Sequence, residues 1–177
     1  MTESHPDGPQ ADGIEIRPIR AGDDAAMARV IREVMTEMGA SGPGFAIHDA
    51  EVDALSVAYS GPRSAYWVVV DDEGLAGGGG FAPLAGGDGG TCELRKMYYL
   101  PRLRGRGLGR RLIETILAAA AQAGYRRCYL ETLASMSRAR VLYEAQGFRK
   151  LCRPEGATGH FGCDSWYELL LAPKDPA

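Results

Sequence analysis

Hydrophobic residues recur along this chain at two different spacings, and each spacing predicts one kind of element. In four segments they return every three or four positions, which places them on one face of a helix. Gly39, Gly124 and Gly147 directly follow three of these segments, and glycine commonly ends a helix. The predicted helices cover residues 24–38, 49–59, 108–123 and, from a cap at Ser135 or Ser137, the stretch up to 146.

Seven further segments are rich in aromatic, β-branched and other apolar residues, in runs or in alternation with polar ones, which predicts strands. They cover residues 13–19, 64–70, 75–81, 92–100, 127–133, 148–152 and 166–171. The third contains four successive glycines, 77–80, which weaken a strand. A bulge, a close backbone or ligand, or tight packing of a neighbouring helix would each explain them.

The elements follow the order β-α-α-β-β-β-α-β-α-β-β, which predicts an α+β (mixed α/β) fold. We expect a single domain over residues 14–171, with a disordered tail at 1–13 and a polar tail at 172–177. A chain of 177 residues with 45% hydrophobic and 24% charged residues is typical of one globular domain.

The stretch between the strand at 92–100 and the helix at 108–123 carries the clearest chemical pattern. Three glycines alternate with arginines there, and five arginines fall within residues 102–111. Glycine allows close approach to a ligand, and the free N–H groups at a helix start attract anions. The pattern therefore predicts a phosphate cradle. A Walker loop would end in Gly-Lys-Ser/Thr and a dinucleotide fingerprint needs Gly-x-Gly-x-x-Gly, and the chain has neither here.

The spacing that fits is Arg104-x-x-Gly107-x-Gly109, which resembles the coenzyme A pyrophosphate loop of the GNAT superfamily of N-acetyltransferases. Downstream, Leu142-Tyr143-x-x-x-Gly147-Phe148 resembles a second signature of that superfamily, in the expected order. The resemblance implies the GNAT fold, with a mostly antiparallel sheet flanked by helices, and acetyl-CoA as cofactor. A Thr158-Gly159-His160 segment resembles uncharacterised bacterial members and fixes no substrate.

The resemblance also implies which residues hold the cofactor. The main chain of Met97 and Tyr99 would pair with the pantetheine arm, where this strand diverges from the next. Side chains of Arg104 and Arg110 would add charge near the pyrophosphate. The backbone amides of the loop would bind that pyrophosphate itself, from Arg104, Gly105, Arg106, Gly107, Leu108 and Gly109. Many members carry Asn where this chain has Met136, so Ser135 or Ser137 would have to replace that contact.

Two residues are the main catalytic candidates. Tyr143 matches a family tyrosine that gives a proton to the leaving thiolate. The alternative role for Tyr143 is purely structural, as a tyrosine of the hydrophobic core. Glu93 stands where some members place the base, and its alternative is a salt bridge to Arg95. Glu131 and then His160, whose reference pKa of about 6.5 suits a base, are the next candidates. Strand alternation places Glu93 on one face with Arg95, Met97 and Tyr99.

Net charge and cysteine content limit the possible partners and the cellular compartment of the protein. A net charge of −3 argues against a protein that coats nucleic acid or anionic membranes. Four cysteines without any Cys-x-x-Cys spacing are typical of free thiols in a cytoplasmic protein, so we expect no metal site. The function predicted is acetyl-CoA-dependent N-acetylation of a small-molecule amine or amino acid. A non-catalytic acetyl-CoA sensor, a protein or hydroxyl acceptor and a homodimer stay open, while the acidic charge argues against the further alternative of a nucleic-acid-binding module, so we expect neither nucleic acid nor membrane as a partner.

Overall fold

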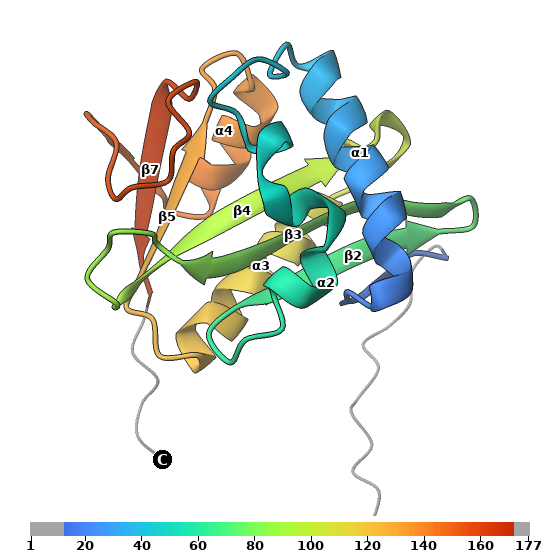
Figure 1. Ribbon diagram of the computed structural model, residues 1–177, viewed down its shortest axis with the longest axis horizontal. Coiled ribbons are helices and arrows are strands. Elements are labelled where there is room, and N and C mark those ends of the chain that lie inside the picture. The colour runs from blue at the N-terminus through green and yellow to red at the C-terminus, as the bar shows by residue number, and fades with distance from the viewer. Residues whose placement is uncertain (1–12, 172–177) are drawn as a thin grey trace, which may run out of the picture.

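The structure, a computed structural model, describes residues 13–171, so both expected tails apart from Gly13 lie outside the described residues. Its strands are β1 (Glu15–Pro18), β2 (Ala65–Asp71), β3 (Gly74–Pro83), β4 (Thr91–Tyr99), β5 (Arg127–Thr132), β6 (Arg149–Leu151) and β7 (Ser165–Leu170). Its α-helices are α1 (Asp24–Glu37), α2 (Leu55–Ala58), α3 (Leu108–Gln122) and α4 (Ser137–Ala145). The order of elements matches the prediction (Figure 1).

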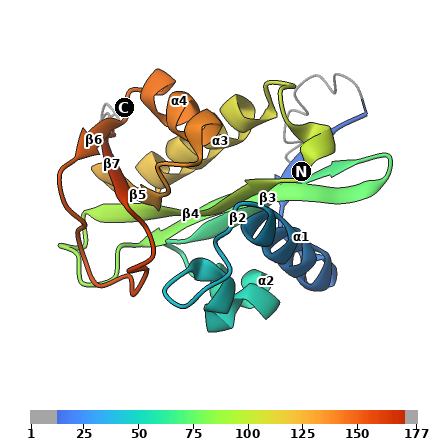
Figure 2. The same cartoon turned by 90° about the horizontal axis from the view of Figure 1, so that it is seen from above.

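The seven strands form one sheet in the order β1-β2-β3-β4-β5-β7-β6. Within it β4 and β5 run parallel, and the other neighbouring pairs are antiparallel. Figure 2 shows α1 and α2 on one face of this sheet and α3 and α4 on the other. The expected mixed α/β class and mostly antiparallel sheet are confirmed.

Each face of the sheet has its own hydrophobic core, built by the apolar stripe of one long helix. The stripe of α1 includes Met27 and Ile31, which are fully buried with Val68 of β2. The stripe of α3 includes Leu112 and Ile116, which are fully buried on the opposite face. These two helices lie where the helical spacing of apolar residues predicted them.

The predicted helix over residues 49–59 is wrong as a continuous element. A 3-10 helix at Ala50–Asp53 is followed by Ala54 with φ −146° and ψ 46°, which breaks the helix before α2 begins. Val52, Leu55 and Tyr59 are nevertheless buried together, as their spacing implied. Two short helical turns satisfy the same apolar spacing as one longer helix.

The glycine-rich strand β3 lies against a bulge in β4 and packs tightly under α1. Gly80 pairs with Arg95 and Gly78 with Tyr98, so two residues of β4 oppose the single residue Gly79. A Cβ atom on Gly78 would lie 2.9 Å from the Met27 sulfur of α1. The tight helix packing that the glycines suggested is therefore present, whereas the bulge at Gly79 belongs to β4 and not to the glycine strand.

Candidate active site

Strands β4 and β5 are side by side at one end and separate at the other (Figure 1). They pair only from Thr91 to Glu93 on β4, against Arg127 to Tyr129 on β5. Beyond that point β5 stays paired with β7 as far as Thr132, while β4 continues along β3 to Tyr99. The divergence leaves an opening in the middle of the sheet.

Two cavities meet at this opening. The larger, of about 420 Å³, lies along the loop before α3 and the start of α4, and we call it the groove. The smaller, of about 70 Å³, contains Glu93, Glu131 and His160, and we call it the small cavity. Five residues line both: Met97, Tyr98, Met136, Ala139 and Tyr143. A molecule that reaches from one cavity into the other must pass these side chains.

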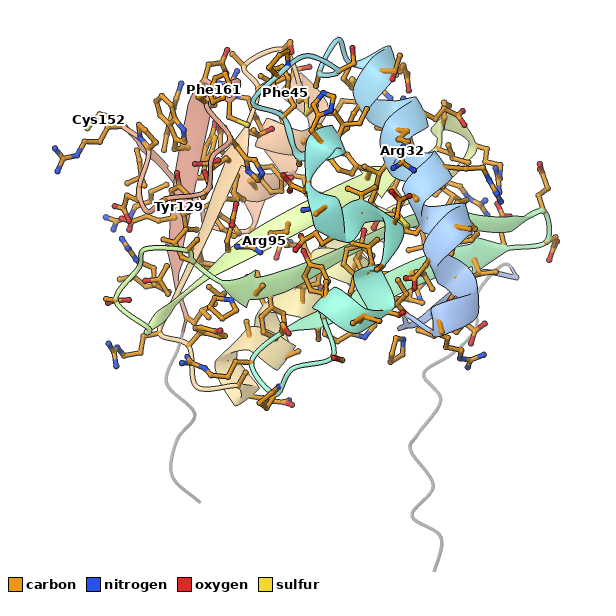
Figure 3. All side chains as sticks on the ribbon, viewed as in Figure 1. Arg32, Phe45, Arg95, Tyr129, Cys152 and Phe161 are labelled. Carbon is orange, nitrogen blue, oxygen red and sulfur yellow. The ribbon has the colours of Figure 1, made fainter. Side chains whose placement is uncertain are left out.

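A bulge at Lys96 decides which side chains of β4 enter which cavity. Lys96 has φ +50° within the strand, and the extra residue reverses the alternation of side chains. Glu93 and Arg95 precede the bulge, so they share one face by ordinary alternation and lie on the α2 side of the sheet (Figure 3). Met97 and Tyr99 instead pack on the α3 side, where the Tyr99 hydroxyl donates to the Leu108 carbonyl at 3.2 Å. The expectation that Glu93 shares a face with Met97 and Tyr99 is wrong. The expectation that Glu93 shares a face with Arg95 is confirmed.

The loop before α3 has the backbone shape of an anion cradle. Gly105 and Gly107 have φ values of 75° and 74°, which favour glycine. Gly107 is the N-cap of α3, and no side chain caps this helix start. Its first N–H groups are thus left to an external acceptor. The groove is lined by seven of the nine residues expected to hold the cofactor: Met97, Tyr99, Arg104, Gly105, Gly107, Leu108 and Gly109.

The two arginines expected to add side-chain charge are both engaged in ion pairs. Arg104 donates two hydrogen bonds to Glu37 of α1, at 2.8 and 2.7 Å, and its Nε donates to the Tyr99 carbonyl at 3.0 Å. Arg110 pairs with Glu114 one turn further along α3, at 2.8 Å. Arg104 thus ties the phosphate loop to α1 and β4, and Arg138 of α4 is the second arginine that lines the groove.

Tyr143 stands in the wall between the two cavities. Its ring is buried against Phe148 and Tyr167, with centroid distances of 5.9 and 6.3 Å. Its hydroxyl makes no hydrogen bond within residues 13–171, and burial raises the pKa of this phenol above its ordinary value. A neutral hydroxyl at this junction has its proton available to a ligand.

Glu93 reaches into the small cavity with one carboxylate oxygen unpaired. Its side chain is 3% exposed, and Oε2 accepts from the Arg95 Nε atom at 2.6 Å. Among the described residues no hydrogen-bond donor reaches Oε1, and the His160 Nδ1 atom lies 3.9 Å from it. Burial raises the pKa of Glu93 above its ordinary value, against the opposing effects of Arg95 and His160.

Glu131, in contrast, has both carboxylate oxygens occupied. Its Oε1 accepts from the Tyr129 hydroxyl at 2.8 Å, and its Oε2 accepts from the Thr158 hydroxyl at 2.9 Å. The His160 Nδ1 atom lies 3.4 Å from the same Oε2. These contacts hold Glu131 in place and leave it less available to an incoming substrate than Glu93.

His160 lies between carboxylates on both sides of its ring. Its Nε2 is 3.1 Å from Asp49 Oδ2, while Nδ1 faces Glu131. The hydrogen bond to Asp49, and then that to Glu131, raise the pKa of His160 to about 9, although burial opposes this. Ligand-type atoms of Glu93, Glu131 and His160 lie within 4.8 Å of one another, close enough for a metal ion. The same carboxylates also suit a charged imidazole, which would have no lone pair for a metal.

Comparisons with known proteins agree with this geometry. A model of the acetyltransferase (GNAT) family matches residues 31–148. The uncharacterized N-acetyltransferase YjgM of Escherichia coli is 43% identical over 150 residues, which cover 84% of this chain and 90% of that protein. The chain belongs to the acetyltransferase (GNAT) family.

Solved structures share the fold of this GNAT protein. A GNAT-family acetyltransferase from Staphylococcus aureus superimposes with a TM-score of 0.78 at 17% identity, covering 90% of this chain and 99% of that one. The yncA protein of Salmonella typhimurium, solved with acetyl-CoA, superimposes with a TM-score of 0.72 at 18% identity. The match covers 93% of this chain and 98% of that one. The expected GNAT fold and acetyltransferase class are confirmed, as is acetyl-CoA at the level of the family. In residues 13–171 no helix has the length and apolar character that a membrane crossing requires.

Sequence analysis missed several residues of the small cavity and its surroundings. Asp49 was expected only as the first residue of the helix over 49–59, and its side chain instead binds His160 and Lys96. Tyr98 was not among the expected cofactor or catalytic residues, and it lines both cavities because of the bulge. Thr158 was noted only as part of a motif. Lys96, inside a strand of mostly apolar residues, was the one sign in the sequence that a carboxylate such as Asp49 lies nearby, since a buried lysine requires a carboxylate partner.

Proposed function

We propose that this GNAT protein transfers an acetyl group from acetyl-CoA to the amine of a small molecule or amino acid by direct attack. When bound, acetyl-CoA supplies the thioester that carries the acetyl group. The groove fits its pyrophosphate, because a Cβ atom built on Gly105 or Gly107 meets no protein atom within 4 Å. The loop therefore leaves space beside free helical N–H groups, as a phosphate requires.

The observation that carries the proposal is the Oε1 atom of Glu93, which accepts no hydrogen bond within residues 13–171, in a cavity that Tyr143 also lines. Glu93 would accept the proton that the amine releases, directly or through a water, as the nitrogen bonds to the acetyl carbon. Tyr143 would give its hydroxyl proton to the sulfur as the carbon–sulfur bond breaks. The tyrosine would then regain a proton from water.

The size of the small cavity supports a small acceptor. A cavity of about 70 Å³ is far below the roughly 300 Å³ at which drug-sized ligand sites begin. Its apolar side is formed by side chains of α1 and of the segment that follows, including Met35 and Phe45. We infer that a compact amine enters from this side and presents its nitrogen to Glu93.

The proposal is tested by thiol release from acetyl-CoA in the presence of amines, amino acids and alcohols of graded size, with CoA affinity measured separately by calorimetry. Small amines or amino acids should release thiol and yield the N-acetyl product. Tight acetyl-CoA binding without any acetylated acceptor would instead identify a sensor. Release with alcohols alone would identify an O-acetyltransferase.

A further inference from the structure

The Thr158-Gly159-His160 segment lies in the loop between β6 and β7 and closes onto the small cavity. Thr158 donates its hydroxyl to Glu131 Oε2 at 2.9 Å, and the His160 backbone N–H donates to the Thr158 hydroxyl oxygen at 3.2 Å. Gly159 has φ +79°, which turns the chain between the two. Thr158 and His160 are thereby brought to the same carboxylate oxygen of Glu131.

The same loop is tied to the segment between α1 and α2. The Gly162 N–H donates to the Gly44 carbonyl at 3.1 Å, and a Cβ atom on Gly162 would lie 2.6 Å from the ring of Phe45. Figure 3 shows Phe45 and Phe161 near one another above the sheet. The charged contact in this junction is between His160 Nε2 and Asp49, at 3.1 Å. Asp49 is held in turn by Lys96 Nζ at 2.7 Å.

We propose that His160 is a positioning residue that acts as a fixed cation. Its imidazolium joins the loop to Asp49 and Glu131, closes the small cavity and keeps Glu93 in its anionic form. Its Nε2 hydrogen-bonds Asp49 and its Nδ1 lies 3.4 Å from Glu131 Oε2, so carboxylate oxygens at both nitrogens stabilise the ring in its charged form. A charged ring cannot accept a proton, so His160 is not the base. This inference rests on the proposed role of Glu93 as the base.

The charges around His160 come from every element that packs against it. Asp49 lies on the segment before α2, Glu93 and Arg95 on β4, and Glu131 on β5. Cys163 lines the same cavity from the loop itself, and burial raises the pKa of this thiol to about 12, so it stays neutral. Three carboxylates thus face one ring, while the guanidinium of Arg95 is paired with Glu93.

The first test is direct and needs no turnover. We expect the imidazole of His160, followed by nuclear magnetic resonance and identified by its loss in His160→Asn, to titrate near pH 9 in the wild-type protein. Asp49→Asn should lower this value because the hydrogen bond between the imidazolium and the Asp49 carboxylate is lost. Titration of His160 near its reference value of about 6.5 would overturn the proposal, whether or not the protein acetylates amines.

The second test uses the pH profile of kcat/KM. His160→Asn removes a cation beside Glu93, so the acid limb should move to higher pH by about one unit, or about tenfold in kcat/KM on that side. His160→Lys restores the charge and should bring the limb back toward wild type. His48→Asn is the matched control, since His48 is exposed and its ring bonds the Ser41 carbonyl, away from the small cavity, and it should leave the profile unchanged. Identical limbs for His160→Asn and His160→Lys would refute the role of charge.

Discussion

Lys96 and Asp49 are 47 residues apart in the chain, and their side chains meet at 2.7 Å between Nζ and Oδ2. Lys96 Nζ also lies 2.6 Å from Glu51 Oε1, and the lysine side chain is 1% exposed. The bulge in β4 aims this side chain across the sheet face, toward the segment that carries both carboxylates. One buried cation therefore fixes the segment that in turn holds His160.

We expect Lys96→Met to destabilise the fold by about 3 kcal/mol, because two carboxylates would lose a buried partner. The measurement is the free energy of unfolding from urea titration. Arg32→Met is the control, since it breaks an equally short but exposed ion pair with Asp53, and it should remain close to wild type. Equal stability of the two variants would show that Lys96 does not anchor the segment.

Some of this architecture was readable from the sequence because it depends on local spacing. The apolar stripe of α3 and the glycines before it specify a helix and its N-terminus through neighbouring residues alone. The position of His160 depends instead on contacts with Asp49, 111 residues earlier, and no local pattern encodes such a pairing.

The bulge at Lys96 shows a second limit. Strand alternation placed Glu93 with Met97 and Tyr99, and one extra residue moved them to opposite faces. Residues with a positive φ are usually Gly, Asn or Asp, and here the residue is Lys96, with φ +50°. The residue type therefore gave no indication of the bulge. Arg104 illustrates a third limit, since no local pattern indicated its ion pair with Glu37 of α1.

Replacing Gly107 separates cofactor binding from backbone strain. Gly107 and Gly124 have φ values of 74° and 86°, and a Cβ on either meets no protein atom within 4 Å. Gly107→Val and Gly124→Val should therefore carry a similar cost in stability, about 1–2 kcal/mol. Only Gly107→Val should raise the CoA dissociation constant, by about tenfold or more, because its side chain would occupy the pyrophosphate site. Calorimetry that gives the same CoA affinity for both variants would refute the phosphate cradle.

Tyr143→Phe tests the proton donor. Since the Tyr143 hydroxyl has no hydrogen-bond partner in residues 13–171, the variant should keep the stability of the wild type and its acetyl-CoA affinity. We expect kcat to fall by about 10²-fold, because a proton donor acts in the transition state. Tyr125→Phe is the opposite control: it loses a hydrogen bond to the Arg63 carbonyl, which should lower stability and leave kcat unchanged. Full turnover by Tyr143→Phe would make this residue a core tyrosine.

Glu93→Gln tests the base. The pKa of Glu93 is raised above its ordinary value, so kcat/KM of the wild type should rise with pH as this carboxylic acid loses its proton, at a pH above the reference of about 4.3. Glutamine keeps the shape and can still accept from Arg95, but it cannot take a proton. We expect kcat/KM to fall by about 10²-fold, with acetyl-CoA affinity unchanged.

The shape of the pH profile distinguishes this loss from a structural one. Without Glu93, attack depends on amine that has already lost its proton in solution, so the remaining rate should climb toward the higher pKa of the amine itself. Glu131→Gln is the matched control, because both oxygens of Glu131 are already occupied by Tyr129 and Thr158. It should retain the acid limb of the wild type. If Glu131→Gln loses the limb and Glu93→Gln keeps it, the base is Glu131, and Glu93 serves to hold Arg95.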